Sequence, residues 1–145
     1  MSSVIGVIPT FPLNWELLKT RANTKIEVNE ISKGYLYKIE FRGKLFNFRN
    51  SDSRKDFKIH PPIEYLDEKR SNLIDIESLS RGWESVGCSY YIAPEGEYED
   101  ADFVDLVAII AETTQGIILN INSIWSWSFG LSTPQELISR SSALR

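Results

Sequence analysis

The sequence has little of what most active sites require. Its 145 residues include one cysteine, Cys88, and one histidine, His60. A single cysteine excludes an intramolecular disulfide framework and zinc sites built from cysteine pairs, and catalytic triads would depend on the one histidine. Phosphate-binding loops, dinucleotide-binding glycine patterns and nucleophile elbows are absent too. We therefore predict no catalytic residues, no cofactor and no metal, and so no enzyme.

Both residues also have ordinary interpretations. His60 precedes Pro61-Pro62 in a polar stretch that is typical of a surface loop. Cys88 opens a short apolar run, and a free cysteine in such a run commonly packs as a small hydrophobe. To act as a nucleophile, it would need a neighbouring base or positive charge that lowers the pKa of its thiol.

Long apolar runs are missing as well. A helix that spans a bilayer needs about 20 consecutive apolar residues, and the longest run here, residues 103–111, is interrupted by Asp105. Residues 1–11 lack the basic and apolar regions of a secretory signal. A single cysteine also fits a reducing compartment. We therefore expect a cytoplasmic protein with no membrane partner.

Positive charge is absent from one long stretch. The net charge is −4, and all but two of the 16 Lys and Arg lie in residues 1–81. Residues 82–139 contain none of them. The acids of that stretch are Glu84, Glu95, Glu97, Glu99, Asp100, Asp102, Asp105, Glu112 and Glu136. Such a segment repels nucleic acid and attracts basic surfaces, so we predict a basic protein partner and no nucleic acid.

The acidic run from Glu95 to Asp105 admits several interpretations. Its spacing does not match the calcium-binding loop of an EF-hand. Two of its carboxylates could form an acid–base pair, but only if folding brings them together in a cleft. It could be a solvated loop whose last acids stabilise the N-terminus of a helix. It could also be a surface that binds a partner.

The apolar periodicity predicts an α+β fold in a single domain, residues 1–145, with one mixed, mainly antiparallel sheet and packed helices. Alternation over residues 35–42 predicts a strand with one apolar face, and Arg42-Gly43-Lys44 predicts a tight turn into the next strand. Residues 26–31 are expected to pair on the other side of residues 35–42. This half is typical of an antiparallel meander.

Helices dominate the predictions for the second half. Ser71 or Asn72 is expected to cap a helix that ends near Gly82, and Asp102 to cap a second helix. The apolar positions of this second helix share one face: Phe103, Leu106, Val107, Ile110 and Ala111. Strands at residues 88–92 and 117–121 flank it, which indicates a crossover between parallel strands. Residues 133–136 resemble a capping box that opens a last helix.

Large aromatics recur near the end of the acidic stretch. Trp125, Trp127 and Phe129 alternate with serines and would share one face if the chain were extended. They are either a core face or an exposed patch that anchors a partner, because Trp is enriched at binding hot spots.

Residues 103–125, FVDLVAIIAETTQGIILNINSIW, resemble a pattern found in small bacterial immunity proteins. In that pattern an acidic loop leads into a helix, then a Thr/Gly junction, then a hydrophobic strand that ends in an aromatic residue. The resemblance implies a cytoplasmic protein that binds and blocks a cognate toxin domain, without chemistry of its own.

Our hypothesis is therefore a non-enzymatic binding protein of the immunity type, which neutralises a basic toxin domain by direct contact. An adaptor or structural subunit of a complex is one alternative, and a small enzyme or ligand-binding domain with an acidic pocket is another. Association with copies of itself stays open. The predicted contact residues are Glu95, Glu97, Glu99, Asp100 and Asp102, with Trp125 and Trp127 as candidate anchors.

Overall fold

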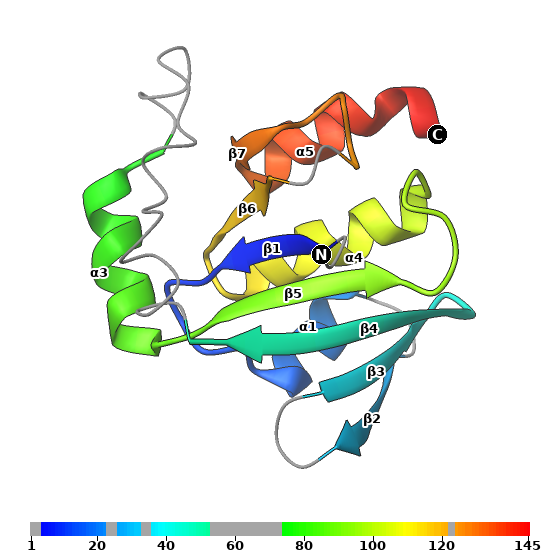
Figure 1. Ribbon diagram of the computed structural model, residues 1–145, viewed down its shortest axis with the longest axis horizontal. Coiled ribbons are helices and arrows are strands. Elements are labelled where there is room, and N and C mark those ends of the chain that lie inside the picture. Colours follow the sequence, from blue (N-terminus) through cyan, green and yellow to red (C-terminus); the bar gives the residue numbers. More distant parts are fainter. Residues whose placement is uncertain (1–3, 23–25, 33–35, 53–73, 122–123) are drawn as a thin grey trace.

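In the part of the chain that the structure describes, seven strands form one sheet in the order β2-β3-β4-β5-β1-β6-β7 (Figure 1). The computed structural model describes residues 4–22, 26–32, 36–52, 74–121 and 124–145. The strands are β1 (Ile5–Ile8), β2 (Ile26–Ser32), β3 (Leu36–Phe41), β4 (Lys44–Ser51), β5 (Ser89–Pro94), β6 (Ile117–Asn120) and β7 (Gly130–Ser132). The helices are α1 (Trp15–Ala22), α3 (Ile76–Val86), α4 (Ala101–Thr113), α5 (Pro134–Arg140) and the 3-10 helix η3 (Ser141–Leu144). The predicted α+β class is confirmed.

Every strand pairing in the described residues is antiparallel, so the sheet is simpler than the mixed sheet predicted. β5 and β6 both pair with β1, one on each side of it. They therefore run in the same direction, as the crossover hypothesis required, but β1 lies between them. None of the helices in the described ranges is long and apolar enough to cross a bilayer.

The meander β2–β3–β4 forms as expected, and its second turn is tight. Phe41 pairs with Lys44, so only Arg42 and Gly43 connect the two strands. Both residues have positive φ, 54° and 76°. This is the type I′ conformation, which matches the twist of the strands and favours glycine at its second position. The turn fixes Arg42 and Lys44 side by side at the end of the sheet.

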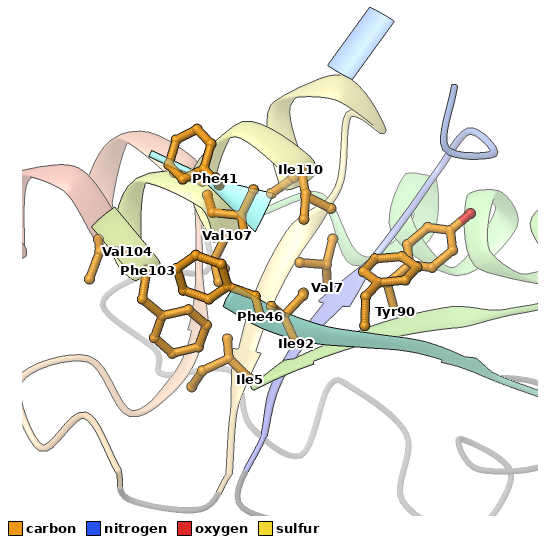
Figure 2. Close-up of a cluster of buried hydrophobic side chains, with 14 of the residues drawn as sticks. Ile5, Val7, Phe41, Phe46, Tyr90, Ile92, Phe103, Val104, Val107 and Ile110 are labelled. Carbon is orange, nitrogen blue, oxygen red and sulfur yellow. The ribbon is translucent and has the colours of Figure 1, made fainter. Parts of the chain in front are cut away.

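The main core lies between the sheet and α4 (Figure 2). The Phe103 ring stacks on Phe46 with 5.7 Å between centroids, and both side chains are buried. Val7 and Ile118 face this core, whereas their neighbours Ile8 and Leu119 face a second cluster formed with α3. Since successive strand residues point to opposite faces, α4 and α3 cover opposite faces of the sheet.

The limits of α3 differ from the prediction. The helix begins at Ile76 and is capped by Asp75, whose carboxylate accepts from the amide of Ser78. The helix continues through Gly82 to Val86. A Cβ at position 82 would lie 2.5 Å from Cβ of Thr10, so the glycine permits close packing rather than ending the helix.

Three earlier predictions concern residues that the structure does not describe: Ser71, Asn72 and His60 all lie in the undescribed range 53–73. Elsewhere the capping predictions have mixed outcomes. The capping box of α5 is confirmed, with Thr133 and Glu136 each accepting from the other's backbone amide. The predicted N-cap Asp102 of α4 is wrong by two positions. Asp100 caps this helix, because its carboxylate accepts from the amide of Asp102 at 2.8 Å.

Phe103→Ala should lower the free energy of unfolding by about 3–5 kcal/mol, because it removes a fully buried ring from the centre of the core. Urea denaturation followed by circular dichroism measures the change. Phe129→Ala is the matched control, since the Phe129 side chain is 52% exposed and its loss should cost little. Equal losses in the two variants would contradict this packing of α4.

Candidate functional site

The connection between β5 and α4, residues 95–100, carries four of the five predicted contact acids. Glu95, Glu97 and Glu99 are exposed, and Asp100 is partly buried. The amide of Glu95 donates to the carbonyl of Leu45 at 3.0 Å, which fastens the start of the connection to β4. Asp100 fastens its end by capping α4. We call residues 95–99 the acidic loop.

A tryptophan supports the acidic loop from within. The indole N–H of Trp125 donates to the carbonyl of Tyr98 at 2.8 Å. The Trp125 side chain is fully buried and lies 5.2 Å from the Phe103 ring, centroid to centroid. Trp125 therefore joins the acidic loop to the core instead of presenting a surface to a partner.

The three aromatics are not aligned along one face of a strand, because residues 124–129 form turns. Trp127 is partly buried and stacks on Trp125 with 5.2 Å between centroids. Its indole N–H is buried and has no hydrogen-bond partner among the described residues. Phe129 points its ring to solvent. Of the two candidate anchors, Trp125 is fully buried, and only Trp127, which stacks on it, is partly accessible.

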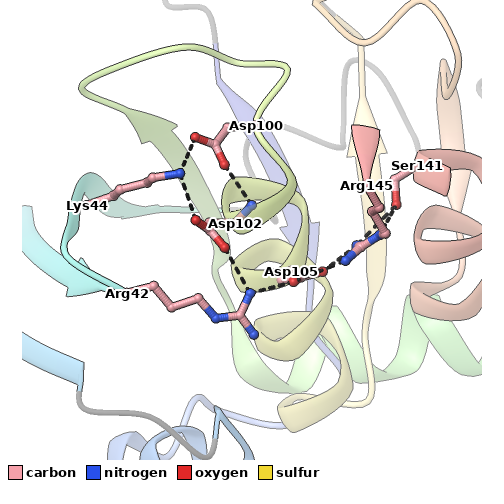
Figure 3. Close-up of polar contacts among 7 residues, drawn as sticks. All are labelled: Arg42, Lys44, Asp100, Asp102, Asp105, Ser141 and Arg145. Atoms are coloured by element: carbon pink, nitrogen blue, oxygen red, sulfur yellow. Dashed lines mark hydrogen bonds and ion pairs between the residues drawn. The ribbon is translucent and has the colours of Figure 1, made fainter. Parts of the chain in front are cut away.

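The acids at the start of α4 are ion-paired with the β3–β4 turn (Figure 3). Nζ of Lys44 lies 2.6 Å from a carboxylate oxygen of Asp100 and 2.7 Å from one of Asp102. Nη1 of Arg42 lies 3.0 Å from Asp102 and 2.6 Å from Asp105. The predicted contact residues Asp100 and Asp102 are therefore partly neutralised within the chain.

Two further pairs complete the network. Arg145 donates to Asp105 and also to the hydroxyl of Ser141, at 3.2 Å, which holds the C-terminal turn against α4. On the sheet, Lys38 pairs with Glu95. Sequence reasoning could not identify these partners, because Arg145 and Asp105 are 40 residues apart and Lys38 and Glu95 are still further apart. Glu97 and Glu99 form no ion pair with any residue that the structure describes.

The ion pairs change the proton affinity of the carboxylates. The hydrogen bond from Lys44, together with that from Arg42, holds the pKa of Asp102 below its ordinary value despite partial burial. Burial alone would raise the pKa of Asp105. Hydrogen bonds from Arg145 and Arg42 outweigh that effect, so the pKa of Asp105 is also lowered. Both groups stay ionised at neutral pH, and the network persists there.

A pocket of about 380 Å³ opens between the β3–β4 turn and the acidic loop. Residues 43–46 line one side, and residues 94–97 with Asp100 line the other. Its wall combines apolar side chains, among them the 40% exposed Leu45, with the carboxylates of Glu95, Glu97 and Asp100. The pocket thus brings together three of the predicted contact acids.

Cys88 lies away from this site, at the start of β5. It is half-buried, and burial raises the pKa of its thiol, as does the nearby charge of Asp52. A hydrogen bond with Tyr90 opposes this shift but does not reverse it. A nucleophilic cysteine needs the opposite shift. Within the described ranges, no group of three His, Cys, Asp or Glu side chains is arranged to hold a metal.

No protein-family model, curated protein or solved structure matches the chain. The immunity-type interpretation therefore has only the residues and their geometry behind it, and it stays a prediction. The geometry offers a fixed loop with exposed carboxylates, a pocket beside it that is lined by both apolar and charged residues, and the partly buried Trp127, which stacks on Trp125.

Asp105→Asn should destabilise the protein at pH 7 by on the order of 1 kcal/mol, the upper end for exposed ion pairs. Because the pKa of Asp105 is lowered on folding, its contribution is fully present above about pH 4, the ordinary value. The contribution is lost as the pH falls through the folded-state pKa. Urea unfolding at pH 7 and pH 2.5 should show the difference between variant and wild type shrinking in acid.

Glu112→Gln is the control for this experiment, because Glu112 is exposed on the same helix. It should leave stability nearly unchanged at both pH values. A difference for Asp105→Asn that stays constant between the two pH values would contradict the role of its charge.

Proposed function

We propose that this protein is a non-enzymatic binding protein of the immunity type, which neutralises a basic toxin domain in the cytoplasm by direct contact through the acidic loop. The observation that carries the proposal is the pair of exposed carboxylates, Glu97 and Glu99, on a loop held at both ends. Neither has an ion-pair partner among the described residues. The lack of a counter-ion among those residues supports a role of the two charges in binding a partner.

The fixed conformation of the loop favours binding. A loop that is already ordered loses little conformational entropy when it meets its partner, so more of the contact energy appears as affinity. The hydrogen bonds at Glu95 and Tyr98 and the cap at Asp100 supply this order. Asp100 and Asp105 are paired with Lys44 and Arg42, so their charges attract a partner less than those of Glu97 and Glu99 do.

A negative loop also suits a basic target on kinetic grounds. Complementary charge at the rim of an interface mainly raises the association rate and makes that rate fall with salt. A toxin that cleaves nucleic acid would have a basic active-site surface, which the acidic loop could cover. The partner is therefore defined by its chemistry: a protein domain with a positively charged functional surface.

The double substitution Glu97→Gln and Glu99→Gln should slow association roughly three- to tenfold and flatten its salt dependence. The partner is first captured from the source cells and purified, and its toxic activity is assayed with and without this protein. Association and dissociation are then measured on an immobilised surface at two ionic strengths. Glu84→Gln with Glu112→Gln, two exposed acids elsewhere, is the charge-matched control and should change neither rate.

Two outcomes would contradict the proposal. One is a genuine partner whose association ignores salt and both loop substitutions. The other is a partner whose activity is unchanged when this protein is bound, which would indicate an adaptor instead of an inhibitor.

Trp127→Ala should raise the dissociation rate of the same complex and cost about 2 kcal/mol or more of binding energy, the usual hot-spot threshold. The reason is that a partly exposed indole beside the loop's support can be desolvated by a partner. Circular dichroism and urea unfolding are the folding controls. A variant that unfolds at much lower urea with unchanged binding when folded would make Trp127 a purely structural residue.

A further inference from the structure

We propose that the pocket between the β3–β4 turn and the acidic loop receives an arginine side chain of the partner. This inference rests on the proposed function and names the chemistry that the same site recognises. The pocket, at about 380 Å³, lies in the lower range of cavities that hold small ligands. It is therefore large enough for one long side chain.

The charges of the lining favour a cation. The residues that line the pocket include three acids, Glu95, Glu97 and Asp100, and one base, Lys44. Glu95 is already held by Lys38, and Lys44 spans Asp100 and Asp102. Glu97 is left without a counter-ion among the described residues. A bound cation would supply that counter-ion. If it also formed an ion pair with Asp100, Lys44 would still be paired with Asp102.

The apolar part of the lining favours a cation with a long stem. Leu45, which is 40% exposed, and Pro94 are both among the residues that line the pocket. Basic side chains bury their methylene groups on such surfaces while the charged group reaches polar partners. The methylene groups of a bound basic side chain would cover Leu45, and its charged group would contact the carboxylates.

Arginine fits this wall better than lysine. A guanidinium is planar, carries five donors and is more weakly hydrated than an ammonium, so it binds several carboxylate oxygens at once and loses less on leaving water. Glu97 is the acid of the lining that has no counter-ion among the described residues, and its two oxygens can accept from one guanidinium side by side. A lysine would satisfy one carboxylate as a point charge, as Lys44 already does for Asp100 and Asp102.

One glycine allows the pocket to be closed without changing its charge. A Cβ added at Gly96 would have no heavy atom within 4 Å, and Gly96 does not have the positive φ that disfavours side chains. Gly96→Leu should therefore fold normally and occupy part of the pocket. Glu97→Gln removes the unpaired carboxylate and leaves the shape intact. Glu112→Gln is the charge-matched control outside the pocket.

The test is an NMR titration of the isotope-labelled protein with blocked amino acids. N-acetyl-arginine amide should give saturable shifts at the amides of Gly43, Leu45 and Gly96. N-acetyl-lysine amide should bind at least threefold more weakly, and the neutral isostere N-acetyl-citrulline amide should give no saturable shift. Arginine binding should be lost in Gly96→Leu, weakened at least fivefold in Glu97→Gln and unchanged in Glu112→Gln.

Three results would overturn the inference: no saturable shift with the arginine probe, equal binding of citrulline, or full binding by Gly96→Leu. Equal binding of citrulline would indicate a site for neutral polar ligands. The proposed function fails separately from the pocket. If Gly96→Leu binds and inhibits the captured partner like the wild type, the pocket is not used although the function stands. If arginine binds the pocket but the captured partner is not inhibited, the function fails although the pocket stands.

Discussion

The burial of α4 is the constraint on which the rest of the structure depends. Eight of its 13 residues are buried, and they form one broad face of the helix, while Glu112 on the other side is exposed. A helix with so broad an apolar face is covered by several elements at once, and α4 contacts β1, β6, α1 and α5. Because Phe103 in its first turn stacks on Phe46 of β4, the N-terminus of α4 is placed against the β3–β4 turn.

That placement explains why part of the negative charge of residues 82–139 is neutralised within the chain. Residues 82–139 contain acids and no Lys or Arg, yet the tight turn presents Arg42 and Lys44 to the acids that begin α4. The field expected from residues 82–139 is thus cancelled where the two halves meet. In the acidic loop it remains at Glu97 and Glu99, which form no ion pair with any of the described residues. A charge pattern in sequence therefore overstates the charge of the surface, and only the fold identifies which acids are free.

The features that local chemistry controls were predictable, and those set by distant contacts were not. The meander, the capping box at Thr133 and the inward face of α4 follow from alternation, spacing and caps. The sequence favoured Asp102 as the N-cap, and Asp100 was selected because its carboxylate reaches the amide of Asp102. Gly82 looked like a helix end because its packing partner, Thr10, is 72 residues away in the chain. The ion pairs and the pocket likewise join distant segments.

The role of Trp125 shows how core and surface are linked at the candidate site. Its ring packs against Phe103 in the core, and its N–H holds the carbonyl of Tyr98 in the acidic loop. An exposed acidic loop would otherwise tend to move, since like charges repel and few apolar groups hold it. Fixing the loop at Tyr98 keeps Glu97 beside the pocket. The conformational entropy of the loop is therefore lost during folding and not again when a partner binds. A partner then meets a charge that is already in position, which is the condition for converting contact into affinity.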